Sequence, residues 1–119
     1  MPLKLDVILS EFNDNSEAWV LQDQDSKKYV IVPDDKYPGK KPIRFFMKRE
    51  DAESFFKEIK KENIYLKNKF INAVKVKLKP ALKNIAMNKN PNNADSFVVH
   101  GPVEVYEFIQ EKQIEPTKN

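Results

Sequence analysis

The spacing of apolar residues changes within residues 43–62, and this change constrains the fold more than any other feature of the chain. Ile43, Phe45 and Met47 alternate as they would on a β-strand. The apolar residues that follow recur at the i, i+3, i+4, i+7 spacing of an amphipathic helix: Ala52, Phe55, Phe56 and Ile59. A buried strand that leads directly into a helix predicts an α/β layer in which the helix packs on the sheet.

The remaining segments can be placed around this unit. Residues 18–22 and 28–33 are rich in β-branched and aromatic residues, and the polar turn 23–27 between them predicts a β-hairpin. Residues 34–42 predict an exposed connection because they hold Gly39 and two prolines. At 70–77 a further strand is predicted, followed by a short helix at 80–87, a polar loop at 88–95 and a strand at 96–100.

The last predicted element is a helix over 102–112, opened by Gly101-Pro102 and supported by apolar residues at 105, 108 and 109. The helix that follows the predicted strand at 43–47 is expected over about 49–63. The order is therefore β-β-β-α-β-α-β-α, a single α/β (α+β) domain with a mixed sheet and helices packed on it. Residues 1–16 form an N-terminal segment, 17–112 the domain and 113–119 a frayed tail. The periodicity of residues 3–12 fits a helix turn or an edge strand.

Length and composition bound the class of protein. A chain of 119 residues with 40% apolar residues can bury one core. No stretch approaches the ~18 apolar residues of a membrane span. The first residues do not resemble a secretory leader, so the chain is expected in the cytoplasm as it stands, or in the periplasm or intermembrane space if a leader has been removed. The absence of cysteine excludes disulfides and thiolate chemistry.

Charge is distributed unevenly along the chain. Residues 36–89 hold sixteen Lys or Arg against five acids, a net charge of +11, whereas residues 1–35 hold three against eight and residues 90–119 two against five. This middle region either forms a solvated surface or binds a polyanion. The candidate anion or nucleic-acid patch comprises Lys36, Lys40, Lys41, Arg44, Lys75, Lys77 and Lys79. From Val74 the strict alternation with lysine is also typical of an edge strand protected from pairing with other chains.

No set of residues predicts catalysis. His100 is the only histidine and has no cysteine or acid at ligand spacing, so it is interpreted as structural. Two glycines exclude a dinucleotide fingerprint and a P-loop, both of which need backbone N–H groups close to phosphate. We therefore expect no enzyme activity, no metal site and no cofactor.

The order of segments is similar to a known family. The pair Trp19-Val-Leu and Tyr29-Val-Ile-Val-Pro33, followed by Ile43-Arg-Phe-Phe-Met47 and a helix with Glu50-Asp-Ala52, resembles the soluble component of the chloroplast inner-envelope translocon and its cyanobacterial relatives (Tic-like proteins). The N-terminal module of the serine-sensitivity-enhancing proteins of type III secretion is similar in its first half. The resemblance implies a non-enzymatic, chaperone-like or adaptor role in protein translocation or envelope biogenesis. The family carries two such units, so it also suggests a homodimer.

Aromatic side chains supply the candidate surface for such a role. Trp19, Phe45, Phe46 and Phe56 are the proposed protein-binding or dimer face, because aromatic anchors concentrate binding energy at interfaces. The alternative is that all four belong to the core. The expected partner is therefore another protein of unknown identity, and the alternative function is a basic nucleic-acid-binding module that uses residues 36–89.

Overall fold

The computed structural model describes residues 2–33, 35–89, 93–101 and 104–109. Its helices and strands follow in the order α1 (Leu5–Leu9), β1 (Glu17–Asp23), β2 (Pro42–Phe46), α2 (Arg49–Glu62), the 3-10 turn η1 (Ile64–Leu66), β3 (Ile71–Lys77), α3 (Leu78–Ala86), β4 (Ser96–His100) and β5 (Val105–Ile109). The class predicted from sequence, a mixed sheet with helices packed on it, is confirmed.

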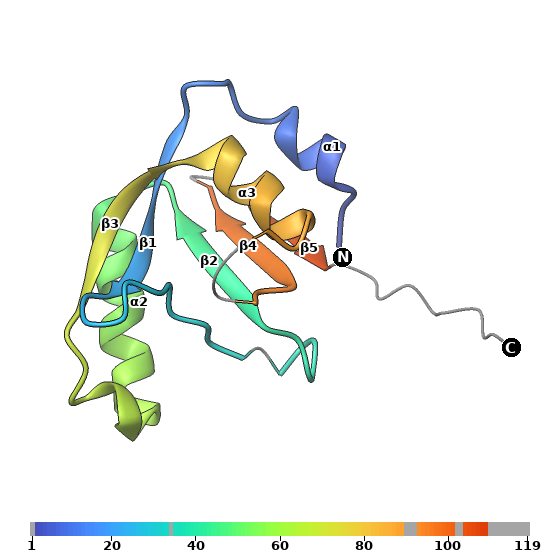
Figure 1. Cartoon of the computed structure of the whole chain (residues 1–119). Helices are drawn as coiled ribbons and strands as arrows, with labels where there is room; N and C mark the ends of the chain where they lie inside the picture. Colours follow the sequence, from blue (N-terminus) through green and yellow to red (C-terminus); the bar gives the residue numbers. More distant parts are fainter. Residues whose placement is uncertain (1, 34, 90–92, 102–103, 110–119) are drawn as a thin grey trace, which may run out of the picture.

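The five strands form one sheet in the order β3-β1-β2-β4-β5. β1 pairs antiparallel with both β2 and β3, β2 pairs parallel with β4, and β4 pairs antiparallel with β5. Figure 1 shows β3 at one edge of this sheet, with α2 against one face and α3 and α1 against the other. The prediction that the lysine-alternating strand lies at an edge is thus confirmed.

Each face of the sheet has its own hydrophobic core. The face toward α1 and α3 buries the alternate residues Ile43 and Phe45 of β2, which pack against Phe97 and Val99 of β4. The opposite face buries Leu21 and Phe46 against Ala52 and Ile59 of α2. The predicted helical spacing in α2 is confirmed, and Glu50 and Asp51 in its first turn and Lys60 and Lys61 in its last favour the helix dipole.

The predicted final helix at 102–112 is wrong, because Val105–Ile109 is strand β5. Within it, Tyr106 and Phe108 face the α1–α3 core while Glu107 faces the other side, which is the period of two expected for a strand. Gly101 does not open a helix: its N–H donates to the Glu104 carbonyl at 2.9 Å, as between the ends of paired antiparallel strands. Glu104 precedes the strand, and residues 102–103 and 110–112 of that prediction lie outside the described ranges.

The predicted second hairpin strand, 28–33, is also wrong in its extent. This segment makes only two isolated bridges, Gln22 with Tyr29 and Ile31 with Ile43. β3 pairs with β1 along one side, and β2 pairs with Trp19 and Val20 on the other. Only the last part of that second side is left for residues 28–33, where Val30 N donates to Leu21 O at 2.9 Å. The segment therefore crosses from the end of β1 toward β2.

Smaller points of the prediction are resolved as well. Of the two structures predicted for residues 3–12, a helix turn or an edge strand, the chain adopts the short helix α1. α3 starts at Leu78, so Pro80 lies in its first turn, where no intrahelical N–H donor is needed. The predicted tail, 113–119, lies outside the described residues.

Candidate functional site

The four aromatic residues predicted to form a binding face do not share a surface. Phe45 is fully buried and Phe46 is 3% exposed, so these two belong to the core and neither can contact a partner in this fold. Trp19 and Phe56 are half-buried. The guanidinium of Arg49 lies 5.3 Å from the centroid of the Trp19 ring, so the remaining exposed part of that ring faces a cation.

The predicted basic patch divides into two groups at opposite parts of the sheet. The first group comprises Lys36, Lys40, Lys41 and Arg44 and lies near β2 and β5. In this group Lys36 Nζ is 3.3 Å from Glu107 Oε1, and Arg44 Nη1 is 3.1 Å from His100 Nε2. These cations are therefore engaged in contacts that fasten the 35–41 connection and β2 to the rest of the sheet.

The second group comprises Lys75, Lys77 and Lys79 and follows the opposite edge, along β3 and into α3. Lys75 Nζ is 3.7 Å from Glu17 Oε1, and Lys79 Nζ is 3.2 Å from Asp14 Oδ1. Lys75 and Lys77 are exposed. The exposed pair of Lys75 with Glu17 contributes little stability, so Lys75 and Lys77 remain available to a charged partner, whereas the Lys79 side chain is largely covered.

The outer edge of β3 is open along its length. Phe70 O accepts from Gln24 N at 2.8 Å and Leu78 N donates to Ser16 O at 3.0 Å, so the even-numbered residues between them direct their backbone groups toward β1. Because backbone groups alternate in direction along an antiparallel strand, residues 71, 73, 75 and 77 direct their N–H and C=O groups away from the sheet. In the described part of the chain, β3 pairs with β1 alone.

A group of exposed apolar side chains lies just before this edge. Ile64 is 71% exposed, Tyr65 53% and Phe70 60%, whereas Leu66 between them is buried and anchors η1. Lys67 and Lys69, also exposed, lie within the same segment. We call these five exposed residues, 64, 65, 67, 69 and 70, the η1 surface.

A groove of about 160 Å³ connects the η1 surface to the turn after β1. Tyr65, Val30 and Ile71 contribute apolar lining. Asp23 is its acidic residue: Asp23 Oδ1 accepts the Asp25 backbone N–H at 2.9 Å, and Lys69 Nζ is 3.7 Å from Oδ2. The hydrogen bond from Asp25 is the main cause that lowers the pKa of the Asp23 carboxyl, so this group stays ionised and internally paired.

The sequence pattern did not indicate that Tyr65 and Phe70 are exposed. Their exposure was missed because residues 64–70 follow neither the helical nor the strand period, which leaves the direction of each side chain undetermined. The position of residues 64–70 could have indicated their exposure, because a short segment between a helix and an edge strand has few neighbours to cover it.

Two further properties concern the described residues only. No group of three His, Cys, Asp or Glu side chains there is arranged to hold a metal ion. None of the helices in that part of the chain has both the length and the apolar character needed to cross a membrane.

No protein-family model matches the chain, and no curated protein matches its sequence. Among solved structures, a weak similarity is found to Anabaena Tic22, described as a protein-transport protein. The TM-score is 0.48 at 16% sequence identity, and the alignment covers 83% of this chain and 46% of that one. The chain thus spans less than half the length of that protein, and a likeness of this size carries no conclusion about function.

Proposed function

We propose that this chain is a non-enzymatic protein-binding module that takes up an extended, acidic segment of another protein along β3. The observation that carries the proposal is the outward direction of the backbone groups at 71, 73, 75 and 77. An open edge of this kind can add a strand from a partner through main-chain hydrogen bonds, while side chains on the two strands provide specificity.

Charge selects the occupant of this edge. Lys75 and Lys77 project from β3 itself, and Lys67 and Lys69 precede it, in a region whose net charge is +11 between residues 36 and 89. A partner strand with carboxylates at alternate positions would meet these ammonium groups, whereas a basic strand would be repelled.

The η1 surface adds apolar contacts at the end of the edge. Tyr65 and Phe70 expose more than half of their area, and large aromatic side chains are typical anchors of protein interfaces. The groove beside Tyr65 offers space for an apolar side chain of the incoming segment. A matching ligand therefore combines acidic and apolar residues in alternation.

The same charges act against a homodimer formed through β3. Pairing two copies of this edge would bring Lys75 and Lys77 of one copy against those of the other, and like charges on facing strands are destabilising. Lysine on an edge strand thus prevents self-association while leaving the edge open to an acidic partner. We accordingly propose a different protein as the partner at this edge, in place of the homodimer expected from sequence.

The biological setting that we propose follows from the resemblance in sequence. A module that holds extended acidic segments fits a chaperone-like or adaptor role in protein translocation or envelope biogenesis. Its proposed location is the cytoplasm for the chain as given, or the periplasm or intermembrane space for a chain from which a leader has been removed.

One observation favours nucleic acid as a second candidate. Tyr65 and Phe70 are exposed beside Lys67 and Lys69, and exposed aromatics interleaved with lysines can stack bases while contacting phosphates. Nucleic acid would not use the open edge of β3, because bases and phosphates cannot form the main-chain hydrogen bonds that add a strand to a β-sheet. For this reason nucleic acid is an alternative outcome of the test below.

The test is fluorescence anisotropy with a labelled peptide of alternating Glu and Val. We expect saturable binding that weakens with salt. The same peptide N-methylated at every amide has no N–H donor left for the sheet and should not bind, and a peptide of alternating Lys and Val should not bind. Binding of an oligothymidine but of none of these peptides would support the nucleic-acid function and contradict the proposal.

Charge reversal locates the binding on β3. The double variant Lys75→Glu/Lys77→Glu should weaken binding of the Glu/Val peptide at least about tenfold and gain binding of the Lys/Val peptide. The control Lys57→Glu/Lys83→Glu changes the net charge equally on exposed positions of α2 and α3 and should retain the original preference. Equal losses in both variants would show that net charge alone attracts the peptide, which would overturn the assignment to β3.

A further inference from the structure

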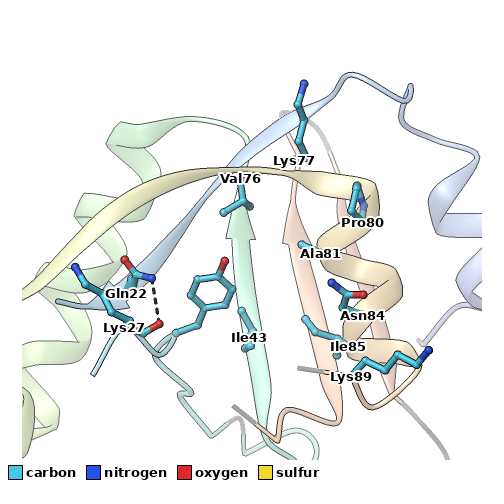
Figure 2. A pocket seen from close by; sticks show the side chains of 11 residues that line it. Gln22, Lys27, Ile43, Val76, Lys77, Pro80, Ala81, Asn84, Ile85 and Lys89 are labelled. Carbon is cyan, nitrogen blue, oxygen red and sulfur yellow. Dashed lines mark hydrogen bonds between the residues drawn. The ribbon is translucent and has the colours of Figure 1, made fainter. Parts of the chain in front are cut away.

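A separate cavity of about 350 Å³ lies on the other face of the sheet, between α3 and strands β2 and β3. Figure 2 shows Val76 of β3, Ile43 of β2 and Ile85 of α3 around it, with Gln22 and Lys27 on the far side from the helix. Its volume falls within the range of roughly 300–1,000 Å³ that is typical of small-molecule sites. Of the residues that form the peptide edge and the η1 surface, Lys77 alone also lines this cavity.

The inner part of the cavity is apolar. Ile43 is fully buried and Ile85 is 2% exposed, and Val76, Ala81 and Pro80 complete the hydrophobic lining. Water in such a space gains few hydrogen bonds, so a hydrocarbon group displaces it favourably.

The outer part of the cavity is polar and positively charged. Lys27, Lys77 and Lys89 line it together with Gln22, Asn84 and Tyr29, and no acidic residue contributes to the lining. Among the described residues, none of the three lysines forms an ion pair. Burial raises the pKa of the Tyr29 hydroxyl, so this group keeps its proton and can donate a hydrogen bond at neutral pH.

We propose that the cavity binds a small amphiphilic anion, specifically a medium-chain carboxylate. The hydrocarbon chain lies against Ile43, Val76 and Ile85, and the carboxylate lies at the lysine-lined mouth. In Figure 2 the Lys77 and Lys89 side chains extend away from the cavity. Binding therefore draws the ammonium groups inward, a movement that exposed lysines make rapidly.

The chemistry can be tested by NMR titration of the whole chain with three probes of equal chain length: octanoate, 1-octanol and octylammonium. Octanoate should shift the backbone amides of Ala81, Ile85 and Val76 and saturate below its micelle-forming concentration. Octanol should bind about tenfold more weakly because it lacks the charge-assisted interaction, and octylammonium should not bind. Equal binding of all three probes, or no shifts at these amides, would overturn the proposal.

Two variants separate cavity binding from adsorption to the surface. Ala81→Trp fills the cavity and should abolish the octanoate shifts, whereas Lys83→Trp places the same side chain on α3 outside the lining and should preserve them. Lys27→Gln/Lys89→Gln leaves the apolar lining and Lys77 intact and should weaken octanoate binding toward that of octanol. Unchanged octanoate binding in either Ala81→Trp or the lysine variant would contradict the site. Peptide binding at β3 should survive all of these changes, so the two proposals fail independently.

Discussion

The imidazole ring of His100 stacks on the ring of Phe46, with centroids 4.5 Å apart and planes 4° from parallel. On the same ring, Nε2 lies 3.1 Å from Nη1 of Arg44. Because a guanidinium can only donate, Nε2 accepts and the proton of the neutral ring resides on Nδ1. Burial, and to a smaller extent the charge of Arg44, lowers the pKa of His100 to about 4. The histidine therefore acts as a neutral, stacked part of the fold, as sequence analysis interpreted it.

This depressed pKa makes stability depend on pH in a defined window. The unfolded chain takes up a proton near pH 6.5, whereas the folded chain does so only near pH 4. The stabilising contribution is therefore complete above pH 6.5 and is lost as the pH falls toward 4. Allowing for partial solvent exposure of the ring, the free energy of unfolding should fall by about 1–2 kcal/mol across this window.

Urea unfolding of the wild type and of His100→Gln over this pH range provides the measurement. The glutamine variant does not titrate, so its stability should change less between pH 6.5 and 4, and the difference between the two curves isolates the histidine. Parallel curves would contradict the lowered pKa.

Phe45 and Phe56 should differ strongly in their contributions to stability. Phe45 is fully buried, so Phe45→Ala should lower the free energy of unfolding by about 3–5 kcal/mol. Phe56 is half-buried with Lys60 Nζ 4.9 Å from its ring centroid, so Phe56→Ala should cost about 1 kcal/mol. Chemical denaturation of both variants measures the difference, and similar costs would mean that the core boundary is placed wrongly.

Gly39 should be needed for its backbone conformation and not for its small size. Its φ is +83°, and a Cβ at this position would meet nothing within 4 Å. Lys40 N donates to Tyr37 O at 3.2 Å, and Pro38 precedes the glycine, which is typical of a type II turn. Gly39→Ala should therefore destabilise the protein by about 1 kcal/mol through conformational strain alone.

An asparagine at the same place tolerates positive φ better, so Gly39→Asn should cost less than the alanine variant. Thermal unfolding of both variants checks this order. An alanine variant as stable as the wild type would show that the turn adopts another conformation in solution.

Sequence reasoning located the central elements because their apolar periods are regular. The alternation at 43–47, the helical spacing from Ala52 to Ile59 and the lysine alternation after Val74 all appear in the structure as β2, α2 and β3. In α2 and β3 one face is buried and the other is solvated, and that contrast produces the pattern. β2 is buried on both faces, and its alternation is visible because Arg44 lies between Ile43 and Phe45.

The missed elements lack such a contrast. In 105–109, apolar residues at 105, 108 and 109 imitate a helical face, but Tyr106 and Phe108 are the pair that packs on the core. Residues 28–33 could not pair fully because they lie along the edge of β1 on which β2 pairs with Trp19 and Val20, and no local pattern indicates such competition. The cavity under α3 likewise arises from tertiary contacts, because β2, β3 and α3 supply its lining from segments distant in sequence.

The measurement that tests the central claim most directly is amide hydrogen exchange along β3 with and without the Glu/Val peptide. In the free protein, Asn72, Val74 and Val76 should be protected by β1, whereas Ala73, Lys75 and Lys77 should exchange quickly. Added peptide should protect the second set and leave the first unchanged, which would show that a strand pairs with the outer edge. Binding that leaves Ala73 and Lys75 in fast exchange would contradict the account.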